Sequence, residues 1–124
     1  MAVNTLLGTV INSPNPPQID IRVTNGGPGM GESALVTVTV VWDPSVMSFG
    51  SVVSPTARVT VTNSSCTWTD YGIAWGANKV FKVNLYRKSG ITAETYVIAT
   101  ATDTRGNDFD SVSWQVPAGH PQEP

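Results

Sequence analysis

The sequence predicts an all-β protein, built as a sandwich of two antiparallel sheets with seven to nine strands. Three observations predict this fold class. Val, Ile and Thr, which favour pleated sheet, make up 38 of the 124 residues. The strong helix formers are scarce, with four Leu, three Lys, three Glu and three Gln. Short segments of alternating polarity recur about every ten residues, and turns rich in Gly, Pro and Asn separate them.

The first half of the chain is expected to form strands over residues 5–12, 18–25, 34–42 and 46–53. The first segment alternates weakly and the second clearly, whereas the third is the strongest, with valines on one side and threonines on the other. The proline-rich segment 13–17 is expected to be an extended loop, because Pro cannot donate a ladder hydrogen bond. The glycine-rich segment 25–31 is the strongest loop signal in the chain.

The second half is expected to continue with strands over residues 58–61, 66–69, 71–75, 80–87, 92–102 and 109–116. The first two alternate around a polar break, and the third is a short return strand before a turn at 76–78. The last three alternate β-branched or aromatic residues with polar ones. The inward faces are therefore rich in Val, Ile and aromatic residues, and the outward faces are rich in Thr and Ser. Such a neutral outer surface suits packing against another protein, and the alternative is a simple solvated sheet.

Length and charge restrict the class of protein further. A chain of 124 residues forms one domain with a single core. Its 7 basic and 9 acidic residues give a net charge of −2, so the basic face typical of nucleic-acid binding is absent. No apolar run approaches the roughly 18 residues of a membrane span. The start carries no secretory signal pattern, which indicates either a protein used or assembled inside the cell or a piece excised from an exported protein.

We expect three parts along the chain. Residues 1–17 form an N-terminal strand and proline-rich segment, residues 18–116 form the sandwich, and residues 117–124 form a C-terminal tail. The proline-rich segment and the tail are expected to order when a partner binds.

Several motifs resemble those of one protein family. Val23-Thr24-Asn25-Gly26-Gly27-Pro28 is similar to a V-T-N-x-G-P opening, Ser65-Cys66-Thr67 to an S-C-T strand, and Gly76-Ala77 to a turn before an alternating strand. The family is that of the immunoglobulin-like repeat domains of unknown function in bacterial and archaeal surface proteins. The resemblance covers residues 18–116 and implies an immunoglobulin-like sandwich. The chain departs from the family where a second cysteine often stands, since that region reads Gly72-Ile73-Ala74-Trp75. Cys66 is therefore alone, which argues against an oxidising location.

One acidic turn is a candidate metal site. Asp103, Asn107, Asp108 and Asp110 surround a single hairpin turn, and clustered carboxylates can supply several of the oxygens that Ca²⁺ requires. The spacing differs from an EF-hand loop, Arg105 lies inside the cluster, and turn geometry alone selects Asp and Asn. We expect no cofactor and no metal, with Ca²⁺ at this turn as the alternative.

Three aromatic residues are a candidate glycan-binding site. Trp68, Tyr71 and Trp75 are close in sequence, and an exposed row of rings could stack on sugars. The alternative is that Trp68 and Trp75 fill the core between the sheets, since a small domain without a disulfide needs such bulk. We favour core packing.

The sequence contains no recognisable catalytic constellation. His120 is the only histidine and lies in the tail, where it is a poor general base. Cys66 has no candidate base beside it. The three glutamates are far apart in sequence, so no carboxylate pair is evident. We therefore predict no catalytic residues and no enzymatic activity.

The resulting functional hypothesis is a structural, protein-binding module. We predict an accessory protein of a virus particle, of the capsid-decoration type, which binds capsid subunits. The first alternative is an adhesion or spacer domain of a bacterial cell-surface protein, located outside the cell, and the second is a carbohydrate-binding module. No nucleic acid or membrane partner is expected. A threonine-rich sheet is also able to pair with a second copy of itself.

Overall fold

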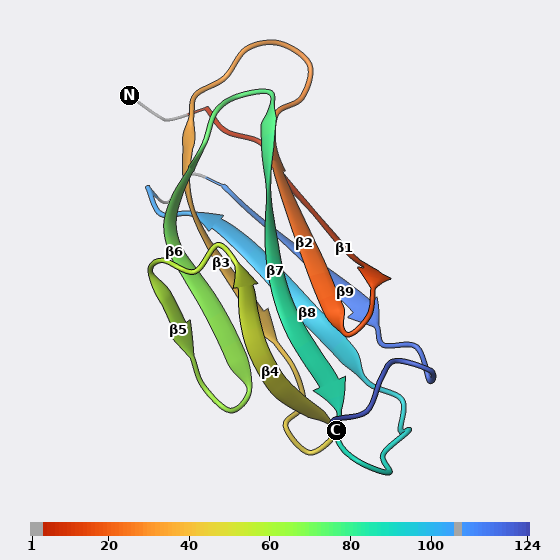
Figure 1. The fold of residues 1–124 in the computed structure, drawn as a ribbon. Helices are drawn as coiled ribbons and strands as arrows, with labels where there is room; N and C mark the ends of the chain where they lie inside the picture. Colours follow the sequence, from red (N-terminus) through yellow and green to blue (C-terminus); the bar gives the residue numbers. More distant parts are fainter. Residues whose placement is uncertain (1–3, 106–107) are drawn as a thin grey trace.

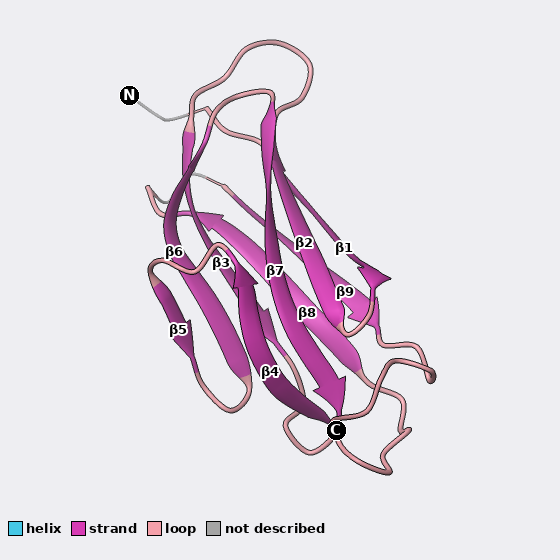
Figure 2. Ribbon diagram, viewed as in Figure 1, coloured by secondary structure: helices cyan, strands magenta, loops and turns pink. Residues whose placement is uncertain are grey.

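The computed structural model describes residues 4–105 and 108–124, which form nine strands and no helix (Figure 2). The strands, in chain order, are β1 (Leu7–Asn15), β2 (Gln18–Asn25), β3 (Ala34–Val41), β4 (Met47–Ser54), β5 (Val59–Val61), β6 (Ser65–Ile73), β7 (Ala77–Arg87), β8 (Tyr96–Asp103) and β9 (Phe109–Gln115). In these residues no helix offers the length and apolarity needed to cross a membrane.

The strands form two antiparallel sheets packed face to face, so the predicted fold class is confirmed. One sheet has the order β1-β2-β7-β4 and the other the order β5-β6-β3-β8-β9 (Figure 1). Most connections cross from one sheet to the other: β2 is followed by β3 in the opposite sheet, and β6 is followed by β7. Hydrogen-bonded neighbours are therefore mostly distant in sequence, and this arrangement is characteristic of immunoglobulin-like sandwiches.

The core lies between the two sheets and is made by alternate residues of the central strands. Burial along β3 alternates strictly, with Val36, Val38 and Val40 fully buried. The opposite sheet contributes alternate apolar residues of β2 and β7. Trp68 and Phe81 meet across the sheets with ring centroids 5.5 Å apart. Burying a side chain of this size contributes roughly 1.5–3 kcal/mol, which explains how the fold stands without a disulfide.

The boundary expected at residue 18 does not separate two structural parts. β1 pairs with β2 along its length, from Leu7 opposite Asn25 to Asn12 opposite Asp20. The predicted proline-rich loop is mostly strand, because β1 extends to Asn15 and the chain turns only at residues 16–17. Leu7 and Ile11 are buried in the common core. The N-terminal segment is therefore an integral edge of the sandwich.

The strands predicted over residues 66–69 and 71–75 are one continuous strand, β6. The pairing with β3 shifts between Val36, opposite Tyr71, and Val38, opposite Trp68. Two residues of β6 thus face Thr37, and one of them, Asp70, has a positive φ of 60°. This is the geometry of a β-bulge, and Asp is among the residues that tolerate such a φ. The bulge lets both Trp68 and Tyr71 point inward.

Candidate functional site

The acidic turn binds the N-terminal strand instead of forming an open cluster of ligands. The Asp108 carboxylate accepts a hydrogen bond from the Leu7 backbone N–H at 2.6 Å, and the Asp110 carboxylate accepts one from the Thr9 N–H at 2.7 Å. Both acceptors precede or lie on β9, so they join the two sheets at one edge. Asn107, the remaining residue predicted at this site, lies outside the described residues.

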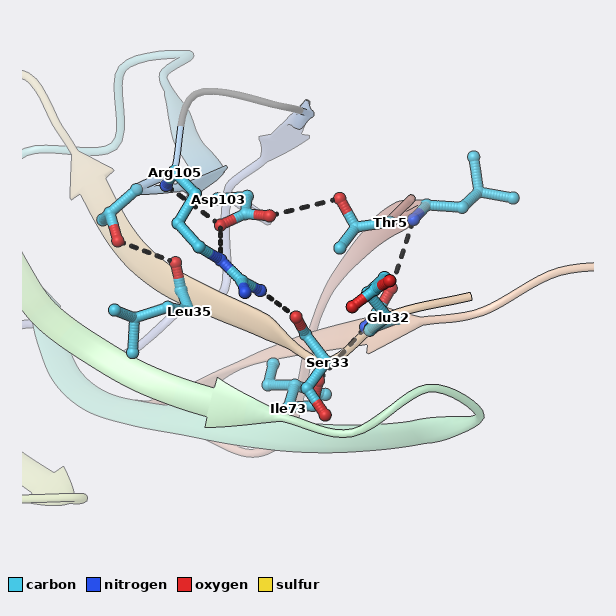
Figure 3. A network of polar contacts seen from close by, with 10 residues as sticks. Thr5, Glu32, Ser33, Leu35, Ile73, Asp103 and Arg105 are labelled. Carbon is cyan, nitrogen blue, oxygen red and sulfur yellow. Dashed lines mark hydrogen bonds and ion pairs between the residues drawn. The ribbon is translucent and has the colours of Figure 1, made fainter. Parts of the chain in front are cut away.

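The third acidic residue, Asp103, is fully buried and has its own partners (Figure 3). Its carboxylate accepts hydrogen bonds from the Thr5 hydroxyl, at 3.3 Å, and from the Arg105 backbone N–H, at 3.1 Å. The Arg105 side chain forms an ion pair with it at 3.5 Å and also donates to the Ser33 carbonyl. Among residues 4–105 and 108–124, no group of three or more His, Cys, Asp or Glu side chains could hold a metal ion. The carboxylates of the candidate Ca²⁺ site instead accept hydrogen bonds from β1 and from neighbouring residues.

The three aromatic residues do not form an exposed row. Trp68 is fully buried and donates from its indole N–H to the Pro55 carbonyl at 2.9 Å. Tyr71 is 7% exposed, and its hydroxyl donates to the Ala57 carbonyl. Trp75 is partly exposed but donates to the Gly29 carbonyl at 3.0 Å. The glycan-binding hypothesis required the three rings to lie exposed in a row, and this expectation is wrong. The favoured alternative, that Trp68 and Trp75 fill the core, is confirmed for Trp68 and wrong for Trp75, whereas Tyr71 is buried beside Trp68.

The C-terminal tail is docked on the sandwich, contrary to the expectation that it orders only on binding. His120 is 4% exposed, and its Nε2 lies 2.7 Å from the Leu85 carbonyl oxygen. Burial is the main reason that the pKa of His120 lies below its ordinary value. The Arg87 backbone N–H donates a hydrogen bond to the Pro121 carbonyl, and the Arg87 carbonyl accepts one from the Glu123 N–H, each at 2.8 Å. The tail thus covers the part of β7 that extends past β2.

Arg87 is the residue that holds the tail, and no sequence pattern announced it. Its side chain is 1% exposed. The guanidinium donates to the carbonyls of Ala93, Val116 and Pro117 at 2.8–3.2 Å. No carboxylate of the described residues forms an ion pair with it. A buried cation held by neutral carbonyls is a structural element. Here it fixes the position of the chain where the tail begins, at the end of the sandwich.

The remaining candidate nucleophile is inert. Cys66 is fully buried on β6, and this burial raises the pKa of its thiol to about 11. The thiolate needed for nucleophilic attack is therefore scarce at neutral pH. A shallow hollow of about 250 Å³ is lined by Pro44, Met47, Ser48, Phe49, Asn63 and Lys88. It contains no carboxylate and no histidine, so nothing in it resembles an acid–base pair.

The most distinctive surface is the outer face of β3, β8 and β9, which we call the neutral face. Each of these strands turns four residues outward, and none of them is charged. They are Leu35, Thr37, Thr39 and Val41 on β3, Tyr96, Ile98, Thr100 and Thr102 on β8, and Phe109, Ser111, Ser113 and Gln115 on β9.

Apolar side chains gather at the two ends of the neutral face. Val41 lies directly opposite Ile98 in the sheet, and both are more than 40% exposed. Tyr96 follows on the same face of β8 and is 46% exposed. At the other end, Phe109 is 69% exposed. A belt of Thr and Ser lies between these ends, with paired hydroxyls such as Thr100 and Ser111 at 3.0 Å.

Charged groups lie at the margins of the neutral face. The Glu94 carboxylate accepts hydrogen bonds from the Tyr96 hydroxyl at 3.0 Å and from the Gln115 amide at 3.3 Å. The first of these contacts raises the pKa of the Tyr96 hydroxyl. Asp70 lies at the β6 bulge, where its N–H reaches the Thr37 hydroxyl. An uncharged centre with a polar margin is the composition of a protein–protein interface.

The outer face of the opposite sheet differs in chemistry. Asp20 on β2 lies directly opposite Lys82 on β7, and the exposed Arg22 follows two residues later. Charges of both signs are thus interspersed on that face, as on an ordinary solvated surface. The contrast between the two faces identifies the neutral face as the better candidate for binding.

Comparisons with known proteins bear on the fold. No protein-family model matches the chain, and no curated protein matches it. Among solved structures, it is similar to a cohesin module from the family 33 glycoside hydrolase of Clostridium perfringens ATCC13124. The TM-score is 0.51 at 10% sequence identity, over 94% of this chain and 98% of the module. This likeness shows the immunoglobulin-like sandwich fold.

Proposed function

We propose that this chain is a non-enzymatic module that binds another protein through its neutral face. The observation that carries the proposal is the exposure of Tyr96, Ile98 and Phe109 on a face where β3, β8 and β9 turn no charge outward. Exposed apolar side chains grouped on one face are a feature of interaction surfaces. The partner surface that fits is itself uncharged at its centre, because a charged group buried there would find no counter-charge.

We place the module in an extracellular or cell-surface protein. The structure that the fold resembles is named as a module of a glycoside hydrolase, so a sandwich of this kind serves there as one part of a larger chain. The arrangement of the ends supports the same role. Asn4 lies beside Glu32 at one end of the sandwich, whereas Glu123 lies beside Ser89 at the other (Figure 1). Modules with their ends so placed can be joined in a linear series.

A virus particle is the other setting that the sequence suggested. That hypothesis expected the proline-rich segment and the tail to order on binding a capsid, whereas both are already parts of the sandwich. These two segments therefore give no support to capsid decoration, although the neutral face would serve there too. Particles are included as one arm of the test.

The test is site-specific cross-linking. A photoreactive residue replaces Thr100, at the centre of the neutral face, and in the control replaces Asn84 on the outer face of β7. Each variant is mixed with cell-surface proteins and, separately, with virus particles from the source organism. The proposal predicts a discrete adduct from the Thr100 position with surface proteins. An adduct with a capsid protein would support the alternative setting, and adducts from the Asn84 position alone would refute the choice of face.

A further inference from the structure

The four edges of the two sheets are protected to different degrees. A sheet edge exposes backbone N–H and C=O groups that can pair with another strand. The edge strand β5 has only three residues, and β4 has two register shifts in its pairing with β7. The free side of β1 is occupied in part, because its Leu7 and Thr9 N–H groups donate to Asp108 and Asp110. These three edges are poor templates for a further strand.

The fourth edge, β9, is longer than β5 and free of register shifts, and the contact that it makes with β1 of the opposite sheet runs through the Asp110 side chain. It pairs with β8 over seven residues without a register shift, and no described strand pairs with its other side. It contains neither Pro nor Gly. Its single charged residue, Asp110, turns inward to Thr9. A long and regular edge whose outward row of side chains is uncharged is a ready template for strand addition.

The pairing pattern shows which backbone groups are offered. The Val116 N–H donates to the Thr95 carbonyl, and the Asp103 N–H donates to the Asp108 carbonyl, so the even-numbered residues of β9 bond to β8. The odd-numbered residues turn their N–H and C=O groups to the free side. These are Phe109, Ser111, Ser113 and Gln115, and all four are exposed.

We propose that a second copy of this chain pairs with β9 in antiparallel fashion, about a two-fold axis at Val112. Full overlap of the seven-residue strand with itself places Phe109 opposite Gln115 and Ser111 opposite Ser113. The residues that face the free edge then pair with one another, so the hydrogen bonds are mutual. No like charges meet across this junction, because the outward row of β9 is uncharged.

Such a dimer joins the two five-stranded sheets into one continuous sheet. Side chains of directly opposite residues point to the same side, so the two neutral faces lie next to each other and face the same way. The pairing stands independently of the proposed function, since it rests on the edge and not on the face. If both hold, the dimer presents two binding faces together and gains from bivalency.

The test combines sedimentation equilibrium with amide hydrogen exchange by NMR over a concentration series of the full chain. We expect a monomer–dimer equilibrium. As the fraction of dimer rises with concentration, hydrogen exchange should slow at the amides of Phe109, Ser111, Ser113 and Gln115. Those of Val112 and Trp114 should be protected at all concentrations, because they bond to β8. A monomer at every concentration would overturn the proposal, as would a dimer in which the odd-numbered amides exchange unchanged.

A charge variant locates the junction. Ser111→Lys combined with Ser113→Lys brings lysines directly opposite each other in the dimer, and like charges so placed are unfavourable. We expect the dimer dissociation constant to rise about tenfold or more. The control combines Ser51→Lys on β4 with Thr60→Lys on β5, which adds the same charge at two other edges. Weakening by the control and not by the β9 variant would show that the copies meet elsewhere. Partner capture by the wild-type chain at concentrations below the dimer dissociation constant, where it is monomeric, separates this proposal from the proposed function.

Discussion

Replacing Arg87 with Met is expected to destabilise the sandwich substantially. The guanidinium makes four hydrogen bonds, to the carbonyls of Ala93, Val116 and Pro117. Hydrogen bonds that involve a charged group contribute roughly 1.5–3 kcal/mol each, so their gross contribution is about 6–12 kcal/mol. Burying a cation without a carboxylate costs several kcal/mol. The net loss for Arg87→Met is therefore about 2–4 kcal/mol, since Met restores much of the apolar packing but leaves three carbonyls without their donor.

Urea unfolding followed by tryptophan fluorescence measures this loss directly. The midpoint should fall while the slope stays constant, because the surface exposed on unfolding is unchanged. The matched control is Arg22→Met on the exposed outer face of β2, for which we expect a change within about 0.5 kcal/mol. If Arg87→Met were as stable as the control, the tail would not be held by the buried guanidinium.

Three further predictions follow from other contacts. Deletion of residues 118–124 should lower the free energy of unfolding by about 2 kcal/mol or more, because it removes the buried His120 and the Pro121 and Glu123 bonds to Arg87; an unchanged urea midpoint would show a tail that is not docked. The pKa of His120 lies below its ordinary 6.5, so the stability it confers is complete above that value and is lost as pH falls through the folded-state pKa. Acid titrations of wild type and His120→Gln should therefore diverge, and parallel curves would contradict this. Asp110→Ala should cost about 1–2 kcal/mol and speed exchange of the Thr9 amide, which loses its acceptor; equal exchange rates in NMR would disprove the bridge between the sheets.

Local alternation predicted the strands well where burial is one-sided. The strand expected over residues 18–25 is β2 with the same bounds, because Ile19, Ile21 and Val23 all face the core. The strand expected over 34–42 is β3, one residue shorter. In these segments the alternation of apolar and polar residues in the sequence matches the alternation of buried and exposed side chains in the fold. The uncharged outer surface predicted from that alternation is confirmed for β3, β8 and β9 and wrong for β2 and β7, where Asp20, Arg22 and Lys82 lie outside.

Features that depend on contacts distant in sequence could not be predicted. The β6 bulge at Asp70 has no local signature, so a single strand was divided into two. Arg87 ends a strand and precedes Lys88, and nothing nearby indicates that it is buried among carbonyls of residues 93–117. The acidic turn illustrates the same limit. Asp and Asn at a turn suggest metal ligands, and only the position of β1 shows that Asp108 and Asp110 bind backbone N–H groups.

The central claim is that the neutral face binds a protein partner, and its most direct test is a measured affinity. Once the cross-linked partner is purified, its dissociation constant is compared for wild type, Ile98→Lys and the control Lys82→Ala on the opposite face. Ile98 is 44% exposed, so Lys is tolerated there in the free module, but in the complex its charge would be buried. We predict a loss of about 30-fold or more for Ile98→Lys, corresponding to about 2 kcal/mol, and no change for Lys82→Ala. Equal affinity of wild type and Ile98→Lys would contradict the account.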